Sequence, residues 1–274
     1  MLLPIPKRLP PADHPASPLR RLAAGPLLVC LDFDGTLAPI VARPDGAKLD
    51  PAMLDRLARL AALVPTAVVS GRDLGDLRDR VPIAGISMVG THGVEIAHAD
   101  GKVERVPGLD RSDARLGGLV ERLRRATAAL SGVLVEPKRH SVAVHWRLAD
   151  PAAEAAAERI VDAAAEDYPE FRVGRGKMVA EFRPAVERDK GGAVALLRRS
   201  ANGAVPAVLY IGDDVTDEDA FRVLDGHCDV GILVADPPRP SAAHWCVPDT
   251  DAVGALLDRL VAARAGLTAS GVTP

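Results

Sequence analysis

The chain has 274 residues, an apolar content of 48% and a net charge of −3, so it can bury more than one domain core. Aromatic residues make up only 3% of it and no basic stripe is present, which argues against nucleic-acid binding. No stretch approaches the length of a membrane span. The cysteines, Cys30, Cys228 and Cys246, form no metal-type pair, which is typical of a reducing compartment. We expect a soluble cytoplasmic monomer that binds neither nucleic acid nor a membrane.

The first residues are apolar but are interrupted by Pro4, Pro6, Pro10 and Pro11, before the core of a signal peptide could form. We expect a flexible leader over residues 1–20 and a frayed tail after about residue 265.

Continuously apolar segments alternate with helical patterns in the first part of the chain and again in its last part. The predicted strands are 27–31, 66–70, 86–89, 207–211 and 230–234, and the predicted helices are 50–64, 74–81, 190–199, 217–224 and 251–264. Apolar strands separated by helices are typical of a parallel sheet covered on both faces. The sequence therefore predicts an α/β fold with a Rossmann-like, doubly wound parallel-sheet core.

The middle of the chain has a different order of predicted elements. A hairpin is predicted around Asp100-Gly101. It is followed by a helix containing Leu116 to Leu123, strands 133–136 and 141–146, a helix over 152–166, and strands 171–173 and 177–183. This order predicts a small open sheet with helices on one face. We expect residues 108–184 to form an inserted α+β cap domain on a core made of 21–107 and 185–274.

The first strand ends in Asp32-Phe-Asp34-Gly-Thr36. Residues two apart in an extended chain point to the same side, so Asp32 and Asp34 would lie close together. Two such carboxylates share a proton or bind a cation. Gly35 permits a tight turn and Thr36 adds a hydroxyl. An Asx-type turn without chemistry is the structural alternative.

Polar groups also follow two later strands: Ser70-Gly71-Arg72, and Asp213-Asp214. Ligands of open parallel sheets bind beyond the carboxyl ends of the strands, and Mg²⁺ would neutralise Asp213 against Asp32. Asp217 and Asp219 could instead stabilise the start of the following helix.

An anionic substrate also needs positive charge, which Lys190 can supply. Ser70 and the N–H groups of residues 71–73 can receive phosphate oxygens. These groups predict a mechanism in which Asp32 attacks phosphorus and forms an aspartyl-phosphate. Asp34 would protonate the leaving alkoxide and later deprotonate the attacking water.

In order and spacing, Asp32-Phe-Asp34-Gly-Thr36, Ser70-Gly-Arg72, Lys190 and Gly212-Asp-Asp resemble the four motifs of the haloacid dehalogenase superfamily phosphatases. Further segments resemble the trehalose-6-phosphate phosphatases: Gly90-Thr-His-Gly-Val-Glu95, Glu136-Pro-Lys138, His145-Trp-Arg147, Lys177 to Pro184, and Gly212 to Asp219. One departure is Trp146, where relatives often carry tyrosine. The resemblance implies a Mg²⁺-dependent hydrolase that converts trehalose 6-phosphate into trehalose and phosphate, the second step of trehalose synthesis.

The resemblance also implies roles for individual residues. Asp32 would be nucleophile and metal ligand, Asp34 acid/base and a ligand through its carbonyl, and Asp213 the other protein ligand. Asp214 is also assigned to the metal site. Asp214 and Asp217 would lie behind the metal ligands without coordinating the metal directly. Catalysis would further involve Thr36, Ser70 and Lys190, and the substrate-binding residues would be Gly71, Arg72, His92, Lys138, Arg147, Lys177 and Glu181.

The cap is expected to recognise the sugar. Alternation along the strand 177–183 places Lys177, Glu181 and Arg183 on one face, for which the structural alternative is a solvated surface. Lys138 and Arg147 are expected to bind phosphate or hydroxyl groups, whereas Glu95 could be a hinge contact.

Other readings stay open at this point. Sucrose-phosphate and mannosyl-phosphoglycerate phosphatases share this type of core and cap, although the acidic run 213–219 favours trehalose phosphate. A phospho-acceptor receiver domain also combines acidic residues, a hydroxyl and a lysine, but needs neither Asp34 nor a cap. A calcium-binding loop is disfavoured because no glutamate closes a twelve-residue loop.

Overall fold

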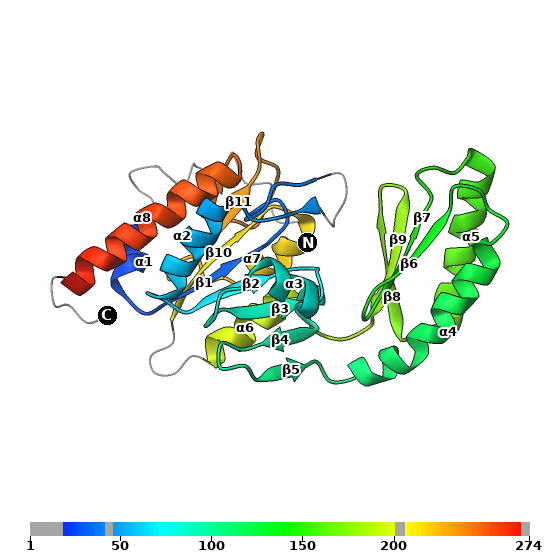
Figure 1. Cartoon of the computed structure of the whole chain (residues 1–274), viewed down its shortest axis with the longest axis horizontal. Helices are drawn as coiled ribbons and strands as arrows, with labels where there is room; N and C mark the ends of the chain where they lie inside the picture. The colour runs from blue at the N-terminus through cyan, green and yellow to red at the C-terminus, as the bar shows by residue number, and fades with distance from the viewer. Residues whose placement is uncertain (1–18, 42–45, 201–205, 270–274) are drawn as a thin grey trace. The chain divides into compact units, whose positions relative to one another are not determined.

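The computed structural model describes residues 19–41, 46–200 and 206–269. The chain divides into two compact units, a core unit of residues 1–104 and 188–274 and an insert unit of residues 105–187 (Figure 1). The expected leader lies, up to residue 18, outside the described residues. Within the described part of the chain, no helix is long and apolar enough to cross a membrane.

The core unit is built on an eight-stranded sheet in the order β12-β11-β10-β1-β2-β3-β4-β5. Its strands are β1 Leu27–Leu31, β2 Thr66–Val69, β3 Ser87–Gly90, β4 Glu95–Ala97, β5 Val103–Arg105, β10 Ala207–Gly212, β11 Val230–Val234 and β12 Trp245–Val247. All neighbours from β12 to β3 are parallel, and β4 runs antiparallel to β3. The predicted mostly parallel α/β fold is confirmed, whereas β12 was not predicted because its three residues carry little pattern.

Helices cover both faces of this sheet. One layer consists of α1 Leu19–Ala24, α2 Pro51–Ala61, α3 Leu74–Arg80 and α8 Thr250–Ala269, and the other of α6 Lys190–Arg199, the 3₁₀ turn η3 Val215–Asp217 and α7 Glu218–Arg222. Alternate residues of β1 face the two layers: Val29 and Leu31 pack in the first, Leu28 and Cys30 in the second. This double burial explains why the strands are apolar throughout. Helix α8 continues to Ala269. The prediction of a frayed tail is therefore wrong for residues 266–269.

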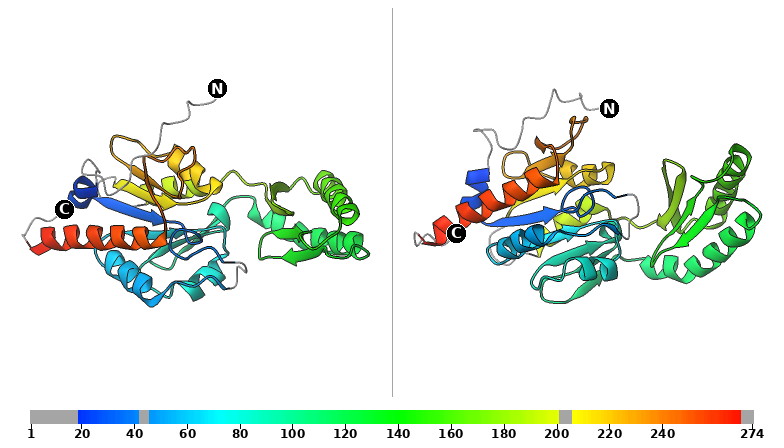
Figure 2. Two further views of the ribbon diagram at one scale, coloured as in Figure 1. Left: turned by 90° about the horizontal axis from the view of Figure 1, so that it is seen from above. Right: turned by 45° about the horizontal axis from the view of Figure 1, so that its top comes forward.

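The insert unit has an antiparallel four-stranded sheet in the order β6-β7-β9-β8. Its elements are α4 Leu109–Thr127, β6 Leu134–Pro137, β7 Val142–His145, α5 Pro151–Asp167, β8 Phe171–Gly176 and β9 Val179–Pro184. Both helices lie on one face of the sheet, in green in Figure 2, and Leu119, Val161, Val144 and Phe182 share one apolar core. Strand β9 begins at Val179, so the prediction that Lys177 lies on this strand is wrong.

Register brings the candidate residues of the core unit to one edge. Leu31, the last residue of β1, pairs with Ile211 on β10 and with Val68 on β2. The residues that follow these strands therefore emerge together at their carboxyl ends, where open parallel sheets bind ligands.

Candidate active site

The first acidic motif turns sharply after β1. Asp32 is buried and its N–H donates to the Ile211 carbonyl at 2.9 Å. The N–H groups of Leu37 and Ala38 both donate to the Phe33 carbonyl, which closes the turn. Gly35 has φ +83°, and a Cβ there would lie 2.1 Å from Asp213 Oδ2. Only glycine allows the two acidic loops to approach this closely.

Lys190 is the first residue of α6, whose start is capped by Asp189 accepting from Gly192 N at 2.8 Å. Its side chain is 3% exposed, and Nζ donates to Asp32 Oδ1 at 2.6 Å and to Asp217 Oδ1 at 2.7 Å. Burial alone would lower the pKa of Lys190, but the two carboxylates outweigh it and raise that pKa. Lys190 is therefore a fixed positive charge beside Asp32.

Asp217 organises the second acidic motif. It is fully buried, and besides Lys190 it accepts from Tyr210 Oη at 2.6 Å. Its other oxygen accepts from the backbone N–H groups of Asp213 at 3.1 Å and Asp214 at 2.9 Å. One carboxylate thus ties the acidic turn, a strand tyrosine and the lysine together.

Three carboxylates converge at this edge. Asp32, Asp213 and Asp217 each offer an oxygen within 4.8 Å of the others. Burial raises the pKa of Asp32 well above its ordinary value, with repulsion from Asp217 and Asp213 adding to it and Lys190 opposing it. Burial, then repulsion from Asp217 and Asp214, raises the pKa of Asp213 to about 7.

These observations fit a divalent cation. Buried Asp213 Oδ1 has no hydrogen-bond partner among the described residues, and one ammonium faces three carboxylates. Hard cations such as Mg²⁺ prefer carboxylate oxygens. Of the predicted metal residues, the structure brings Asp32 and Asp213 together, while Asp214 is exposed and lies outside this cluster.

The carboxylate of Asp34 is held by Arg72. Nε and Nη2 of Arg72 each donate to it at 2.7 Å, and Nη1 donates to Asp76 at 2.7 Å. The guanidinium also lies over the Phe33 ring, 5.2 Å from its centroid. Arg72, predicted to bind substrate, therefore contacts the predicted acid/base group directly.

Ser70, Gly71 and His92 also come together. Ser70 Oγ accepts from Arg72 N at 3.2 Å, and Ser70 O accepts from His92 N at 2.9 Å. A Cβ at Gly71 would lie 2.5 Å from His92 Nε2, so glycine is needed there. Thr36 is buried, and its Oγ1 has no hydrogen-bond partner in the described part of the chain.

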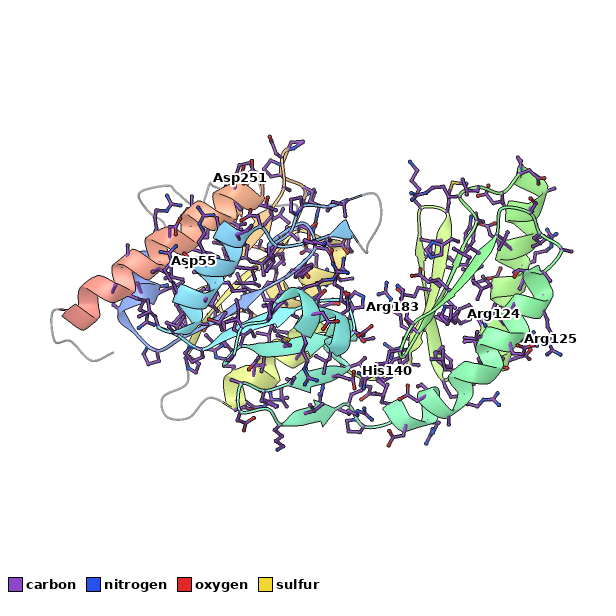
Figure 3. All side chains as sticks on the ribbon, viewed as in Figure 1. Asp55, Arg124, Arg125, His140, Arg183 and Asp251 are labelled. Atoms are coloured by element: carbon purple, nitrogen blue, oxygen red, sulfur yellow. The ribbon has the colours of Figure 1, made fainter. Side chains whose placement is uncertain are left out.

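A charged cluster lies on the insert sheet around Glu181. It accepts from Lys138 Nζ at 2.9 Å, Ser141 Oγ at 2.9 Å and Arg183 Nε at 3.0 Å. Burial opposes ionisation, but Lys138 and Arg183 prevail and lower the pKa of Glu181 to about 2. Arg183 lies on the face of the sheet turned away from α4 and α5 (Figure 3).

The remaining predicted residues of the insert unit lie at the other end of β7. Val142 pairs with Pro137, next to Lys138, whereas His145 pairs with Val179. Arg147 follows β7, and Lys177 precedes β9, at that second end, about 10 Å away along the strand. Both are exposed. The structure therefore separates Arg147 and Lys177 from the Glu181 cluster.

The sequence analysis did not point to Tyr210, which donates to Asp217. It also did not point to Glu218 and Arg239, which form an ion pair beside the acidic turn, where Arg239 donates to the carbonyls of Asp213 and Asp214. Tyr210 carries the one polar side chain of β10, a signal that could have been read. Arg239 follows β11 in a Pro-rich segment and carries no such signal.

The chain is similar in sequence to known proteins. A family model described as trehalose-phosphatase matches residues 30–251. The trehalose-phosphate phosphatase of Mycobacterium tuberculosis is 40% identical over 243 residues, covering 85% of this chain and 60% of the relative. A probable trehalose-phosphate phosphatase 3 of Oryza sativa is 34% identical over 256 residues, covering 86% and 69%. The chain thus spans about 60% of the length of its mycobacterial relatives.

Solved structures share the fold. The C-terminal domain of the C. albicans trehalose-6-phosphate phosphatase superposes with a TM-score of 0.75 at 22% identity, covering 93% of this chain and 98% of that one. The Aspergillus fumigatus trehalose-6-phosphate phosphatase gives a TM-score of 0.69 at 28% identity, covering 92% and 99%. Because the family model spans most of the chain, this chain belongs to the trehalose-phosphatase family.

Proposed function

We propose that this chain is a Mg²⁺-dependent phosphatase that hydrolyses trehalose 6-phosphate to trehalose and phosphate. The observation that carries the proposal is the buried contact between Asp32 and Lys190, 2.6 Å apart, inside a cluster of three carboxylates. The similarity to the trehalose-phosphate phosphatase of Mycobacterium tuberculosis and to the probable one of Oryza sativa supports the choice of substrate.

In the first step, an Asp32 oxygen attacks phosphorus in line and forms an aspartyl-phosphate while the bond from phosphorus to the sugar oxygen breaks. Lys190 holds Asp32 oriented and offsets the negative charge that gathers there. Asp34 gives its proton to the leaving alkoxide. In the second step, water attacks phosphorus and Asp34 takes its proton, while the bond from phosphorus to the Asp32 oxygen breaks, which releases phosphate and restores the Asp32 carboxylate.

Arg72 must release Asp34 during this cycle. Both oxygens of the Asp34 carboxylate accept from Arg72, so neither is free to exchange a proton with the substrate while this contact lasts. Guanidinium groups also bind phosphate. A bound phosphoryl group would therefore compete with Asp34 for Arg72 and free Asp34 to carry a proton.

Asp32 and Asp213 would hold the metal, together with the backbone carbonyl of Asp34, and Asp214 would lie nearby. When bound, Mg²⁺ would neutralise the carboxylates and polarise the phosphoryl oxygens. Ser70, the N–H groups of Gly71 and Arg72, and Thr36 would receive phosphate oxygens, with His92 beside them.

The Glu181 cluster would select the sugar. The Glu181 carboxylate offers hydrogen-bond acceptors, and the ammonium group of Lys138 and the guanidinium group of Arg183 offer the donors that sugar hydroxyl groups need. Arg147 and Lys177, separate from this cluster, would contact the substrate less directly.

We also place the enzyme in the cytoplasm, as a monomer acting on a small molecule. Cys30, Cys228 and Cys246 are all free thiols, which supports a reducing compartment.

Phosphate release from a panel of sugar phosphates, with and without Mg²⁺, tests the proposed function. We expect trehalose 6-phosphate to be preferred over sucrose 6-phosphate and glucose 6-phosphate, with activity lost on metal removal. Asp32→Asn should lower kcat by about 10³-fold or more, because it removes the nucleophile. Asp100→Asn, at an exposed position between β4 and β5, is the control. Undiminished phosphate release by Asp32→Asn would refute the mechanism.

Glu181→Ala tests the role of the insert unit. We expect the ratio of kcat/KM for trehalose 6-phosphate over glucose 6-phosphate to fall by about tenfold, the loss of one charged hydrogen-bonding group. Arg175→Ala, on neighbouring β8, is the control. An unchanged ratio in Glu181→Ala would contradict a role in selectivity.

A further inference from the structure

The acidic turn that carries Asp213 and Asp214 is held on two sides. Its N–H groups donate to the buried Asp217. Its carbonyl groups accept from Arg239 Nη2, at 2.8 Å for Asp214 O and 3.2 Å for Asp213 O. Arg239 comes from the segment between β11 and β12, outside the four motifs.

Glu218 holds Arg239 in place. Arg239 Nη1 donates to Glu218 Oε1 at 2.6 Å, and the other carboxylate oxygen accepts from Ala242 N at 2.8 Å. Glu218 is only 6% exposed although it opens a helix. Both of its oxygens are therefore used to fasten one loop to the acidic turn.

The geometry points to the pair Glu218–Arg239 as a positioning device for the Asp213 carboxylate, an inference that rests on the proposed function. The N–H groups of the two peptides that flank Asp213 Cα donate to Asp217, and the carbonyl of the second accepts from Arg239, so the direction of the Asp213 side chain is restrained too. Asp213 Oδ1 finds no hydrogen-bond partner among the described residues, so its direction depends on this backbone clamp. Arg239 touches no reacting atom and acts through Asp213.

Arginine is the residue type that this role needs. The planar guanidinium group places Nη1 on the Glu218 carboxylate and Nη2 on the carbonyls of Asp213 and Asp214. A lysine ammonium has only one nitrogen and could not span these partners in the same way. A clamp of this kind should set the affinity for the metal without altering the chemical step once the metal is bound.

The test is Mg²⁺ binding measured by titration calorimetry on the full chain, alongside kcat at saturating Mg²⁺. We expect Arg239→Met and Glu218→Gln each to raise the Kd for Mg²⁺ about tenfold, with kcat and KM within about twofold of wild type. The double variant should be no worse than either single one, because both disable the same clamp. Arg239→Lys should fall between wild type and Arg239→Met.

Arg222→Met is the matched control, because Arg222 lies on α7 and pairs with exposed Asp219 at 3.0 Å. It should leave the Kd for Mg²⁺ unchanged. The inference is overturned if Arg239→Met or Arg239→Lys binds Mg²⁺ with the wild-type Kd. A lower Tm with an unchanged Kd would mean that Arg239 has a purely structural role. A wild-type chain that takes up no Mg²⁺ overturns the metal part of the proposed function and this inference with it.

Discussion

At the scale of single residues, the active-site edge is dominated by an excess of buried negative charge. Asp32, Asp213 and Asp217 face one ammonium, that of Lys190. Buried carboxylates are costly unless they are paired or neutralised. This excess lets the edge accept a cation, and it makes that binding compete with protons.

We expect the stabilisation by Mg²⁺ to grow as the pH rises toward 7. The pKa of Asp213 is about 7 in the folded chain and 3.8 ordinarily. Without metal, the folded chain therefore binds more protons than the unfolded chain between these values. The stability that Asp213 contributes is complete below about pH 4 and is lost as the pH rises through 7. A metal replaces the proton and cancels that loss.

The measurement is Tm at pH 5 and pH 8, with and without Mg²⁺. The Mg²⁺-induced rise in Tm should be clearly larger at pH 8, and Asp213→Asn should remove most of it. Asp100→Asn, in the β4–β5 hairpin, is the control. An equal rise at both pH values would count against Asp213 as the titrating ligand.

At the scale of elements, the 3₁₀ turn η2, Thr91–Gly93, sets where α6 begins. Gly93 has φ +112°, and a Cβ there would lie 2.4 Å from the Asp189 carbonyl. Asp189 caps α6, and the next residue is Lys190. The turn after β3 therefore packs directly against the backbone that places Lys190.

Gly93→Ala should displace this backbone. We expect it to lower the free energy of unfolding by about 1 kcal/mol more than Gly101→Ala, and to reduce kcat about tenfold. Gly101 is the matched control, because it also has a positive φ, +89°, but nothing lies within 4 Å of its Cβ position. Denaturant unfolding and phosphate release measure the two effects. Equal losses in both variants would mean that the close approach to Asp189 does not matter.

At the scale of the whole molecule, two units with separate apolar cores are joined by two chain crossings. Glu104 is the last residue of the core unit before the insert and Arg188 the first after it. Their side chains form an ion pair of 2.9 Å, so the two crossings start close together on the core unit.

Replacing residues 105–187 by a short Gly-Ser linker should leave a folded core unit, because both helix layers and all of its sheet except the last residue of β5 remain. We expect this protein to bind Mg²⁺ and to hydrolyse p-nitrophenyl phosphate, but to lose about 10²-fold or more in kcat/KM for trehalose 6-phosphate. Circular dichroism, calorimetry and phosphate release measure these properties. The 274-residue chain with Leu148→Ser, an exposed position of the insert unit, is the control. Retained activity on trehalose 6-phosphate would show that the core unit alone selects the sugar.

Local patterns account for what could be predicted. The predicted strands and helices match the observed ones in type and nearly in their bounds. The strands could be predicted because burial on both faces of the sheet makes each of them an unbroken apolar run. The errors fall where that signal is weak: short β12, and Lys177, which a tight turn at Met178 with φ +61° removes from β9. Arg147 was grouped with Lys138 from residue type alone, and only strand register separates them.

The sequence by itself predicted the fold class and the family, and both are confirmed. It also singled out Asp32, Asp34, Ser70, Lys190 and Asp213 as candidate site residues, because each lies just after a strand or at the start of a helix. The tertiary structure alone decided that Asp217 and not Asp214 joins the carboxylate cluster, and that Arg239 clamps the acidic turn. The physical reason is that a buried charge is stabilised by partners distant in sequence. Lys190 and the segment after β11 reach the acidic turn only once the sheet has formed.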